Sequence, residues 1–150
     1  MIWDMKKFSG RAVISGTCKG KALVTKSGFN VLASCMKSLT DADGTCVSHD
    51  INNKELYGKD INGAILCIPQ TIGSTSAGFM IQAIAAAGLT PKAILYARPA
   101  EPLALSGLIV ADIWDDAKII TIDSLGSDFL DTVQDGDELV VEEDGTVVMV

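Results

Sequence analysis

One loop of small and hydroxyl-bearing residues lies between two apolar segments, and it reads Pro69-Gln70-Thr71-Ile72-Gly73-Ser74-Thr75-Ser76-Ala77-Gly78. The segment before it, 64–68, is an unbroken apolar run with the length of a buried strand. The segment after it is rich in helix formers and ends at Gly88, which predicts a helix over 76–87. We therefore expect a buried strand, a loop and a helix that begins at the loop.

The crowding of hydroxyl groups at this junction has two interpretations. The ordinary one is a helix cap and a turn, because Ser and Thr are common N-caps. The other is an anion site, because a helix start presents unpaired N–H groups and a partial positive charge to a carboxylate, phosphate or oxyanion. One hydroxyl is enough for a cap, whereas three follow Gly73 here. The loop lacks the Gly-Lys-Ser/Thr of a P-loop and the Gly-x-Ser-x-Gly of a nucleophile elbow.

Composition bounds the class of protein. The chain has 150 residues, of which 48% are hydrophobic and 21% charged, so we expect one folded domain over 1–150. A net charge of −7 argues against a nucleic-acid partner, which would need a basic surface. We expect no membrane segment, because no apolar run is long enough to span a bilayer. The first seven residues lack the apolar core of a signal peptide, so a cytoplasmic location is the default.

The cysteines and the histidine give weak signals for a metal. Cys18, Cys35, Cys46 and Cys67 are scattered and form no Cys-x-x-Cys pair. Cys67 lies in the apolar run and is predicted to pack in the core, and the others are predicted to be free thiols. We therefore predict that this chain alone holds no metal, and that His49 is a surface residue.

The pattern of apolar segments predicts an α/β fold. Beyond the central strand and helix, we expect strands over 11–15, 21–25, 92–97 and 118–122, helices over 103–111 and 127–133, and a turn over 16–20. The segment 29–36 is apolar but ambiguous between strand and helix. Alternating strands and helices in the middle of the chain predict a parallel βαβ core with right-handed crossovers.

The two ends of the chain predict an antiparallel layer beside this core. Asp144-Gly145 separates two β-branched runs, 138–142 and 146–150, which is typical of a hairpin. Ligands of open parallel sheets bind beyond the carboxyl ends of the strands. Besides the central loop, Arg98 and Asp123-Ser124 follow predicted strands at that edge, although Asp123-Ser124 is more typical of a turn.

Several short motifs, taken in order, resemble one family. They cover most of the chain and lie at 20–24, 56–58, 61–69, 73–76, 88–95, 107–111, 135–137 and 144–145. Together they resemble the small subunit, or swivel domain, of the aconitase X group. The resemblance implies a swivelling β/β/α domain that closes over a large catalytic partner subunit. Because a shared active site must exclude water, we expect apolar side chains around the loop, Ile72, Phe29 and Leu32, at the partner surface.

The resemblance also implies an activity and roles for residues. The family dehydrates small hydroxy acids, and an iron or iron–sulfur centre is expected on the partner subunit, with no cofactor bound by this chain. The first serine after the loop glycine, Ser74, matches the family's proton-abstracting base. Gly73, Thr75, Ser76 and Asn30 are predicted to bind the substrate, with Thr75 and Ser76 also available to cap the helix.

Two departures bear on the substrate. The segment 27–34 lacks the Pro-Leu-Ser-Phe-type motif of the phosphomevalonate branch, and Ile72 stands where that branch usually has a basic residue. A phosphate would be stabilised by that positive charge. The loop looks more like the cis-3-hydroxy-L-proline dehydratase branch. The alternatives are a phosphomevalonate dehydratase small subunit, or a non-catalytic swivel module that docks on a partner or holds a small ligand.

Overall fold

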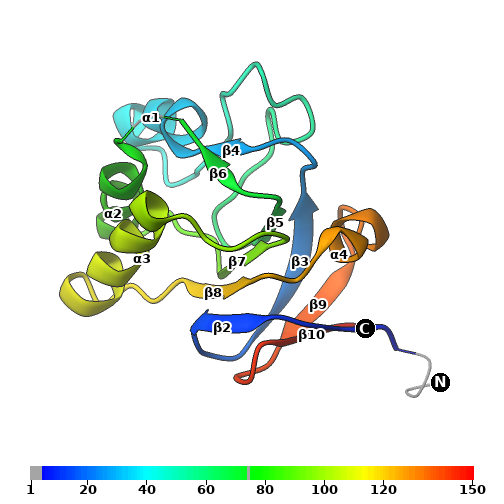
Figure 1. Ribbon diagram of the computed structural model, residues 1–150. Helices are drawn as coiled ribbons and strands as arrows, with labels where there is room; N and C mark the ends of the chain where they lie inside the picture. The colour runs from blue at the N-terminus through cyan, green and yellow to red at the C-terminus, as the bar shows by residue number, and fades with distance from the viewer. Residues whose placement is uncertain (1–4, 74) are drawn as a thin grey trace.

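The computed structural model describes residues 5–73 and 75–150 (Figure 1). It contains strands and helices in mixed order. In chain order they are β1 Lys7–Ser9, β2 Arg11–Ile14, β3 Cys18–Val24, β4 Phe29–Asn30, α1 Val31–Asp41, β5 Ile65–Ile68, β6 Thr71–Ile72, α2 Ala77–Ala86, β7 Ala93–Tyr96, α3 Pro102–Trp114, β8 Ile120–Asp123, α4 Ser127–Thr132, β9 Glu138–Val141 and β10 Thr146–Met149.

Eight strands form one sheet in the order β1-β10-β9-β3-β5-β7-β8-β2. The four central strands β3, β5, β7 and β8 are parallel, and the strands on both sides of them are antiparallel. The end strands β1 and β2 are consecutive in the chain and only Gly10 separates them. The chain therefore joins the two ends of the strand order, and the sheet curls toward itself.

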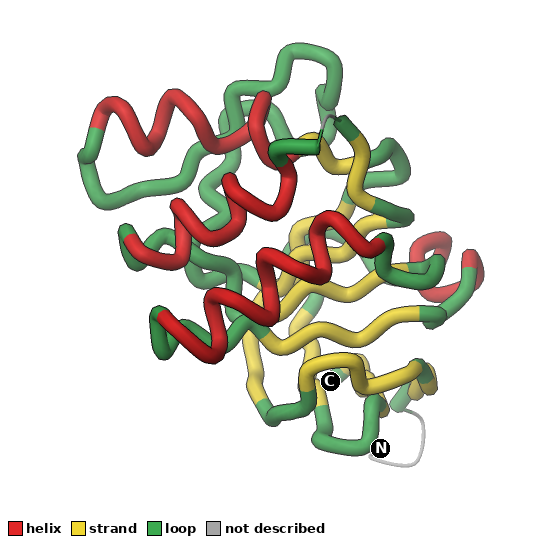
Figure 2. The backbone as a smooth tube through the Cα atoms, turned by 60° about the vertical axis from the view of Figure 1, so that its left-hand side comes forward, coloured by secondary structure: helices red, strands yellow, loops and turns green. Residues whose placement is uncertain are grey.

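The sheet is covered on both faces, which explains its continuous apolar runs. Figure 2 shows α1, α2 and α3 on one face. Along β5, Leu66 and Ile68 belong to the apolar cluster on the helix side, while Ile65 and Cys67 belong to the cluster with α4 and the antiparallel strands. This alternation follows from the two-residue period of a strand. Three layers result, β/β/α.

The predicted α/β class, with a parallel core and a flanking antiparallel layer, is confirmed. The strand and helix on either side of the central loop also form as predicted. Three expectations need correction, and one alternative that the sequence left open is resolved. The predicted turn over 16–20 is wrong in its second half, because β3 already begins at Cys18, where it pairs with Val141 of β9. The ambiguous segment from Phe29 is a two-residue strand followed by α1, and β1 lies outside the predicted strands.

The third correction concerns α3, which extends beyond the predicted Ala111 to Trp114. The additional residues lie beyond the buried part of the helix, and Ile113 and Trp114 are 69% and 77% exposed. Across residues 5–73 and 75–150, no helix is long and apolar enough to cross a membrane.

Candidate functional site

The loop after β5 is held by a small second sheet. Its strand β6 pairs in parallel with β4, so that Phe29 lies opposite Thr71 and Asn30 opposite Ile72. The Phe29 N–H also donates to the Gln70 carbonyl at 2.9 Å. Residues more than forty positions apart in sequence therefore form one rigid platform at the carboxyl edge of the main sheet.

Asn30 and Gly73 meet at the end of this platform. The Asn30 Oδ1 accepts the Ala33 N–H at 3.1 Å and caps α1. Gly73 has a φ of +112°, and a Cβ placed on it would lie 3.1 Å from atoms of the Asn30 side chain. Only glycine adopts this positive φ without strain and also leaves room for the Asn30 side chain. The predicted site residues Asn30 and Gly73 are therefore brought together, and α1 begins beside the loop.

The helix α2 begins four residues after Gly73, with Thr75 exposed and Ser76 at the N-cap position. The Ser76 carbonyl accepts the Met80 N–H at 2.9 Å. Within the described residues the Ser76 side chain makes no capping bond to α2, so the prediction that it caps the helix by its hydroxyl is wrong. Ser74, the predicted base, lies outside the described residues. Its chain neighbours lie between the starts of two helices, whose first turns carry no acidic residue.

Glu101 connects the start of a third helix, α3, to the same loop through hydrogen bonds. This carboxylate accepts the N–H groups of Leu103 and Ala104 at 2.8 and 2.7 Å, and so caps α3. It also accepts the Thr71 hydroxyl at 2.9 Å. The sequence interpretation did not include Glu101, although Pro102 directly after it is a helix-start signal that could have located this cap.

Asp123, at the end of β8, is a structural anchor of this edge. It is fully buried, accepts Arg11 Nε at 2.9 Å and Nη2 at 2.6 Å, and accepts the Ala100 N–H at 2.7 Å. Burial acts to raise the pKa of Asp123, but the hydrogen bonds and charge of Arg11 and the Ala100 N–H outweigh it and hold the pKa below its usual value. The turn favoured for Asp123-Ser124 is only partly right, because Asp123 ends a strand and Ser124 follows with a φ of +59°.

Arg98 is an exposed cation at the same edge. Its N–H donates to the Pro69 carbonyl at 3.2 Å, and its Nη1 lies 3.5 Å from the Gln70 Oε1. Both contacts attach Arg98 to the first two residues of the loop. Whereas Arg11 is engaged by a carboxylate, the guanidinium of Arg98 makes only the long contact to Gln70 among the described residues. Among the described residues it is an available positive side chain next to the loop.

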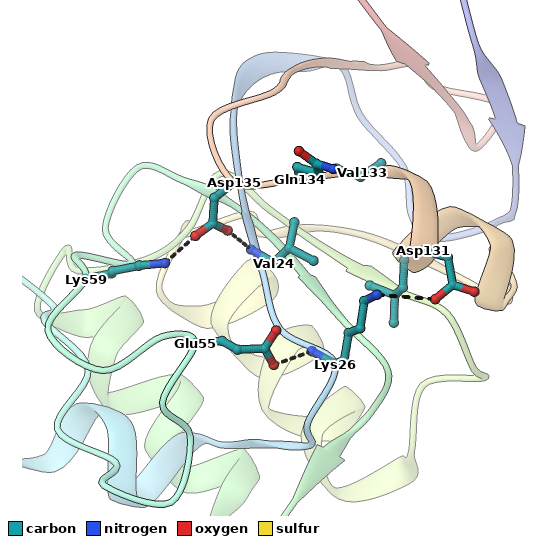
Figure 3. Close-up of a pocket in the computed structure, with 9 residues that line it drawn as sticks. Val24, Lys26, Glu55, Lys59, Asp131, Val133, Gln134 and Asp135 are labelled. Carbon is teal, nitrogen blue, oxygen red and sulfur yellow. Dashed lines mark hydrogen bonds and ion pairs between the residues drawn. The ribbon is translucent and has the colours of Figure 1, made fainter.

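A hollow of about 280 Å³ lies at the carboxyl end of β3, on the α4 side (Figure 3). Charged pairs cross it: Lys26 lies 3.5 Å from Asp131, and Lys59 pairs with Asp135. The Asp135 carboxylate also accepts the Val24 N–H at 2.7 Å. Lys26 thereby connects the segment after β3 to α4, and Lys59 connects to the turn between α4 and β9. Among the described residues that line this hollow, each lysine therefore already faces a carboxylate.

Apolar side chains are exposed next to the loop. Ile72 is 44% exposed, Phe79 71% and Leu103 44%. The helices that carry Phe79 and Leu103 touch, because a Cβ on Gly78 would lie 2.5 Å from the Leu103 carbonyl oxygen. The expectation that Phe29 lies on the partner surface is wrong, because Phe29 is only 3% exposed and packs in the core. Leu32, expected on the same surface, is partly buried.

The cysteines do not make a metal site in the described part of the chain. Across residues 5–73 and 75–150, no group of three or more His, Cys, Asp or Glu side chains is placed to hold a metal ion. All four cysteines are free thiols, and Cys67 is buried in the core as predicted. His49, predicted on the surface, is half-buried, and its N–H donates to the Ser34 carbonyl of α1 at 3.2 Å.

Comparisons with known proteins agree with this architecture. A family model of the aconitase X swivel domain matches residues 7–150. A protein of Methanocella arvoryzae named phosphomevalonate dehydratase small subunit is 29% identical over 140 residues, which are 93% of this chain and 94% of that protein. A protein of the same name from Methanothrix thermoacetophila is 31% identical over 137 residues, 91% of this chain and 89% of that one. The crystal structure of Thermococcus kodakaraensis aconitase X (holo-form) has the same fold, with a TM-score of 0.80 at 24% identity over 97% of this chain and 98% of that chain.

Proposed function

Because the chain belongs to the aconitase X swivel domain family, we propose that it is the small subunit of a hydro-lyase that dehydrates a hydroxy acid. The observation that carries this proposal is the position of the loop. Gly73 and Thr75, the chain neighbours of Ser74, lie between the starts of α1 and α2, and the β4–β6 ladder holds the strand that leads into them. Such a position suits a substrate carboxylate and the negative charge that develops when a proton is removed.

Ser74 is proposed as the proton-abstracting base. A serine hydroxyl is a poor base unless its alkoxide is stabilised, and N–H groups at a helix start supply part of that stabilisation. Gly73, Thr75 and Ser76 are proposed to contact the substrate. Asn30 is proposed to do so from the opposite side of Gly73, and its cap of α1 holds it there. Arg98 adds a guanidinium at the loop entrance, where a carboxylate pairs well with it.

The dehydration also needs an acid that assists the departing hydroxyl, and a metal ion supplies this chemistry in many lyases. The cysteines of this chain do not fit a cluster. Cys67 lies inside the sheet, Cys18 is on β3, and Cys35 and Cys46 are buried behind α1. We therefore place the iron or iron–sulfur centre on a large partner subunit, and assign no step of the reaction through that group to this chain.

The partner is proposed to cover the exposed apolar side chains next to the loop. Ile72, Phe79 and Leu103 lie where a second chain would close a shared active site and exclude water from it. Aromatic and aliphatic side chains of this kind are the usual centre of a protein interface. This surface replaces the one expected from Phe29 and Leu32.

The proposed substrate is cis-3-hydroxy-L-proline, because Ile72 supplies no positive charge next to Gly73 for a phosphate group. Phosphomevalonate is the second candidate, and the names of the relatives favour it. The two differ in the phosphate, so a dehydration assay on both compounds with the assembled two-chain enzyme separates them. Turnover of neither compound, or of any hydroxy acid, by an assembled complex would favour a non-catalytic swivel module.

The decisive test of the site is Ser74→Ala in the assembled complex. We expect turnover to fall by roughly 10²–10⁴-fold while the melting temperature stays nearly unchanged, since general base catalysis contributes about that much. Ser76→Ala is the matched comparison: it removes a neighbouring hydroxyl that contacts the substrate without taking the proton, so it should raise KM while kcat falls far less than in Ser74→Ala. Near-normal turnover in Ser74→Ala would remove Ser74 from the mechanism.

A further inference from the structure

We infer that Cys35 and Cys46 are a reversible disulfide site, which clamps the 42–49 segment onto α1 when a low-molecular-weight disulfide oxidises it. The two sulfur atoms lie 3.2 Å apart although the residues are 11 positions apart in the chain. A disulfide bond is about 2.05 Å long, so the two sulfur atoms need to approach by only about 1 Å. The inference is independent of the dehydratase proposal.

The backbone around the pair already holds the two sulfurs together. The Ser38 hydroxyl of α1 donates to the Val47 carbonyl at 3.1 Å, and the His49 N–H donates to the Ser34 carbonyl at 3.2 Å. The partners on α1, Ser34 and Ser38, lie on either side of Cys35, and their partners Val47 and His49 directly follow Cys46. The closed segment therefore holds the two sulfurs within about 1 Å of bonding distance, and these hydrogen bonds stay in place once the bond has formed.

An oxidant reaches the buried pair through local opening of the short segment before Cys46. Both cysteines are fully buried, but residues 42–44 are exposed, and Ala42 and Gly44 have φ angles of +51° and +84°. Exposed connections of this kind open locally at low cost in free energy. Opening of this segment would expose Cys46 while Cys35 stays in its helix.

The pair also has an attacking and a resolving sulfur. The hydrogen bond with Cys35 holds the pKa of Cys46 below its ordinary value, while burial acts in the opposite direction. Cys46 is the nucleophile because it is the sulfur that opening of residues 42–44 exposes, and a lowered pKa favours its thiolate. It attacks one sulfur of glutathione disulfide, the S–S bond breaks, and the first glutathione leaves as a thiol. Cys35 then loses its proton and attacks the Cys46 sulfur, and the second glutathione leaves. Two electrons pass from the protein thiols to glutathione disulfide.

The test uses the full chain, folded, in glutathione buffers of increasing ratio of disulfide to thiol. The reaction is quenched with acid, free thiols are alkylated, and the peptides are analysed by mass spectrometry. We expect a linked Cys35–Cys46 peptide that has lost two hydrogen atoms and returns to thiols with dithiothreitol. We also expect the melting temperature of the oxidised chain to rise by roughly 5–10 °C, because the bond constrains the unfolded chain.

Two variants separate this bond from other oxidation. Cys46→Ser should lose the linked peptide and the rise in melting temperature, whereas Cys18→Ser should keep both, because Cys18 lies on β3. The wild-type result alone decides the matter if a variant does not fold. The inference is refuted if the most oxidising buffer leaves Cys35 and Cys46 as alkylatable thiols while Cys18 carries glutathione. It is also refuted if the linked peptide forms without a change in melting temperature.

Discussion

Gly107→Ala tests the contact between α2 and α3 that positions the candidate site. A Cβ on Gly107 would lie 2.3 Å from the Gly78 carbonyl oxygen and 2.6 Å from its Cα. Both neighbours are backbone atoms of the second residue of α2, so they cannot move aside as a side chain would. The two helices must separate, and the helix that follows the Ser74 loop must shift with them.

Two opposing effects determine the size of the change. Alanine is favoured over glycine inside a helix by about 1 kcal/mol. Overpacking at a close contact costs about 1–3 kcal/mol. Because both neighbours are backbone atoms, we expect the clash to cost about 2–3 kcal/mol, the upper part of that range. After the helix gain, the free energy of unfolding falls by about 1–2 kcal/mol and the melting temperature by roughly 2–8 °C. Thermal and urea unfolding of the full chain measure both quantities.

The sign of the change is the critical result, because a helix free of contacts would be stabilised by this substitution. Ala86→Gly, at an exposed position of α2, is the control for helix propensity alone and should cost no more than about 1 kcal/mol. An unchanged or raised melting temperature in Gly107→Ala would show that the two helices do not touch as described. In the assembled enzyme, we expect the turnover of Gly107→Ala to fall even at temperatures at which the variant is still fully folded.

Substitutions at three other positions test the elements around the loop. Asp123→Asn should lower the free energy of unfolding at pH 7 by about 1–2 kcal/mol, because it weakens the bonds to Arg11 and Ala100. The pKa of Asp123 is lower in the folded than in the unfolded chain. The ionised carboxylate therefore stabilises the fold above the unfolded pKa, and this stabilisation is lost as the pH falls through the folded pKa. In acid denaturation, the difference in free energy of unfolding between variant and wild type should narrow below about pH 4. A gap that stays constant down to pH 2 would contradict this. Glu101→Ala should cost about 1–2 kcal/mol in urea unfolding, because α3 loses its cap, whereas Glu101→Gln should cost less. Phe79→Ser should leave the stability of the chain within about 0.5 kcal/mol but weaken assembly with the large subunit in sizing experiments, and unchanged assembly would exclude Phe79 from the interface.

Local patterns in the sequence were sufficient to predict most elements. The apolar run at 64–68, the alanine-rich segment after the loop and the Asp144-Gly145 turn each specify a local structure through side-chain period and turn chemistry. The prediction failed where an element depends on a distant partner. The two-residue strands β4 and β6 are too short for any period to reveal, and they exist because they pair with each other. The start of β3 likewise becomes a strand because β9 lies beside it.

In the candidate site, too, some residues could be located from the sequence, whereas others are brought together only by the tertiary structure. The sequence by itself placed Gly73, Thr75 and Ser76 in one loop at a helix start, because neighbours in the chain stay neighbours in the fold. Only the tertiary structure brought Asn30 against Gly73, Glu101 against Thr71, and Cys35 against Cys46. Contacts between residues this far apart depend on how strands align and helices pack across the whole sheet. No local pattern of residues encodes that alignment, because it is the burial of two apolar faces at once that selects it.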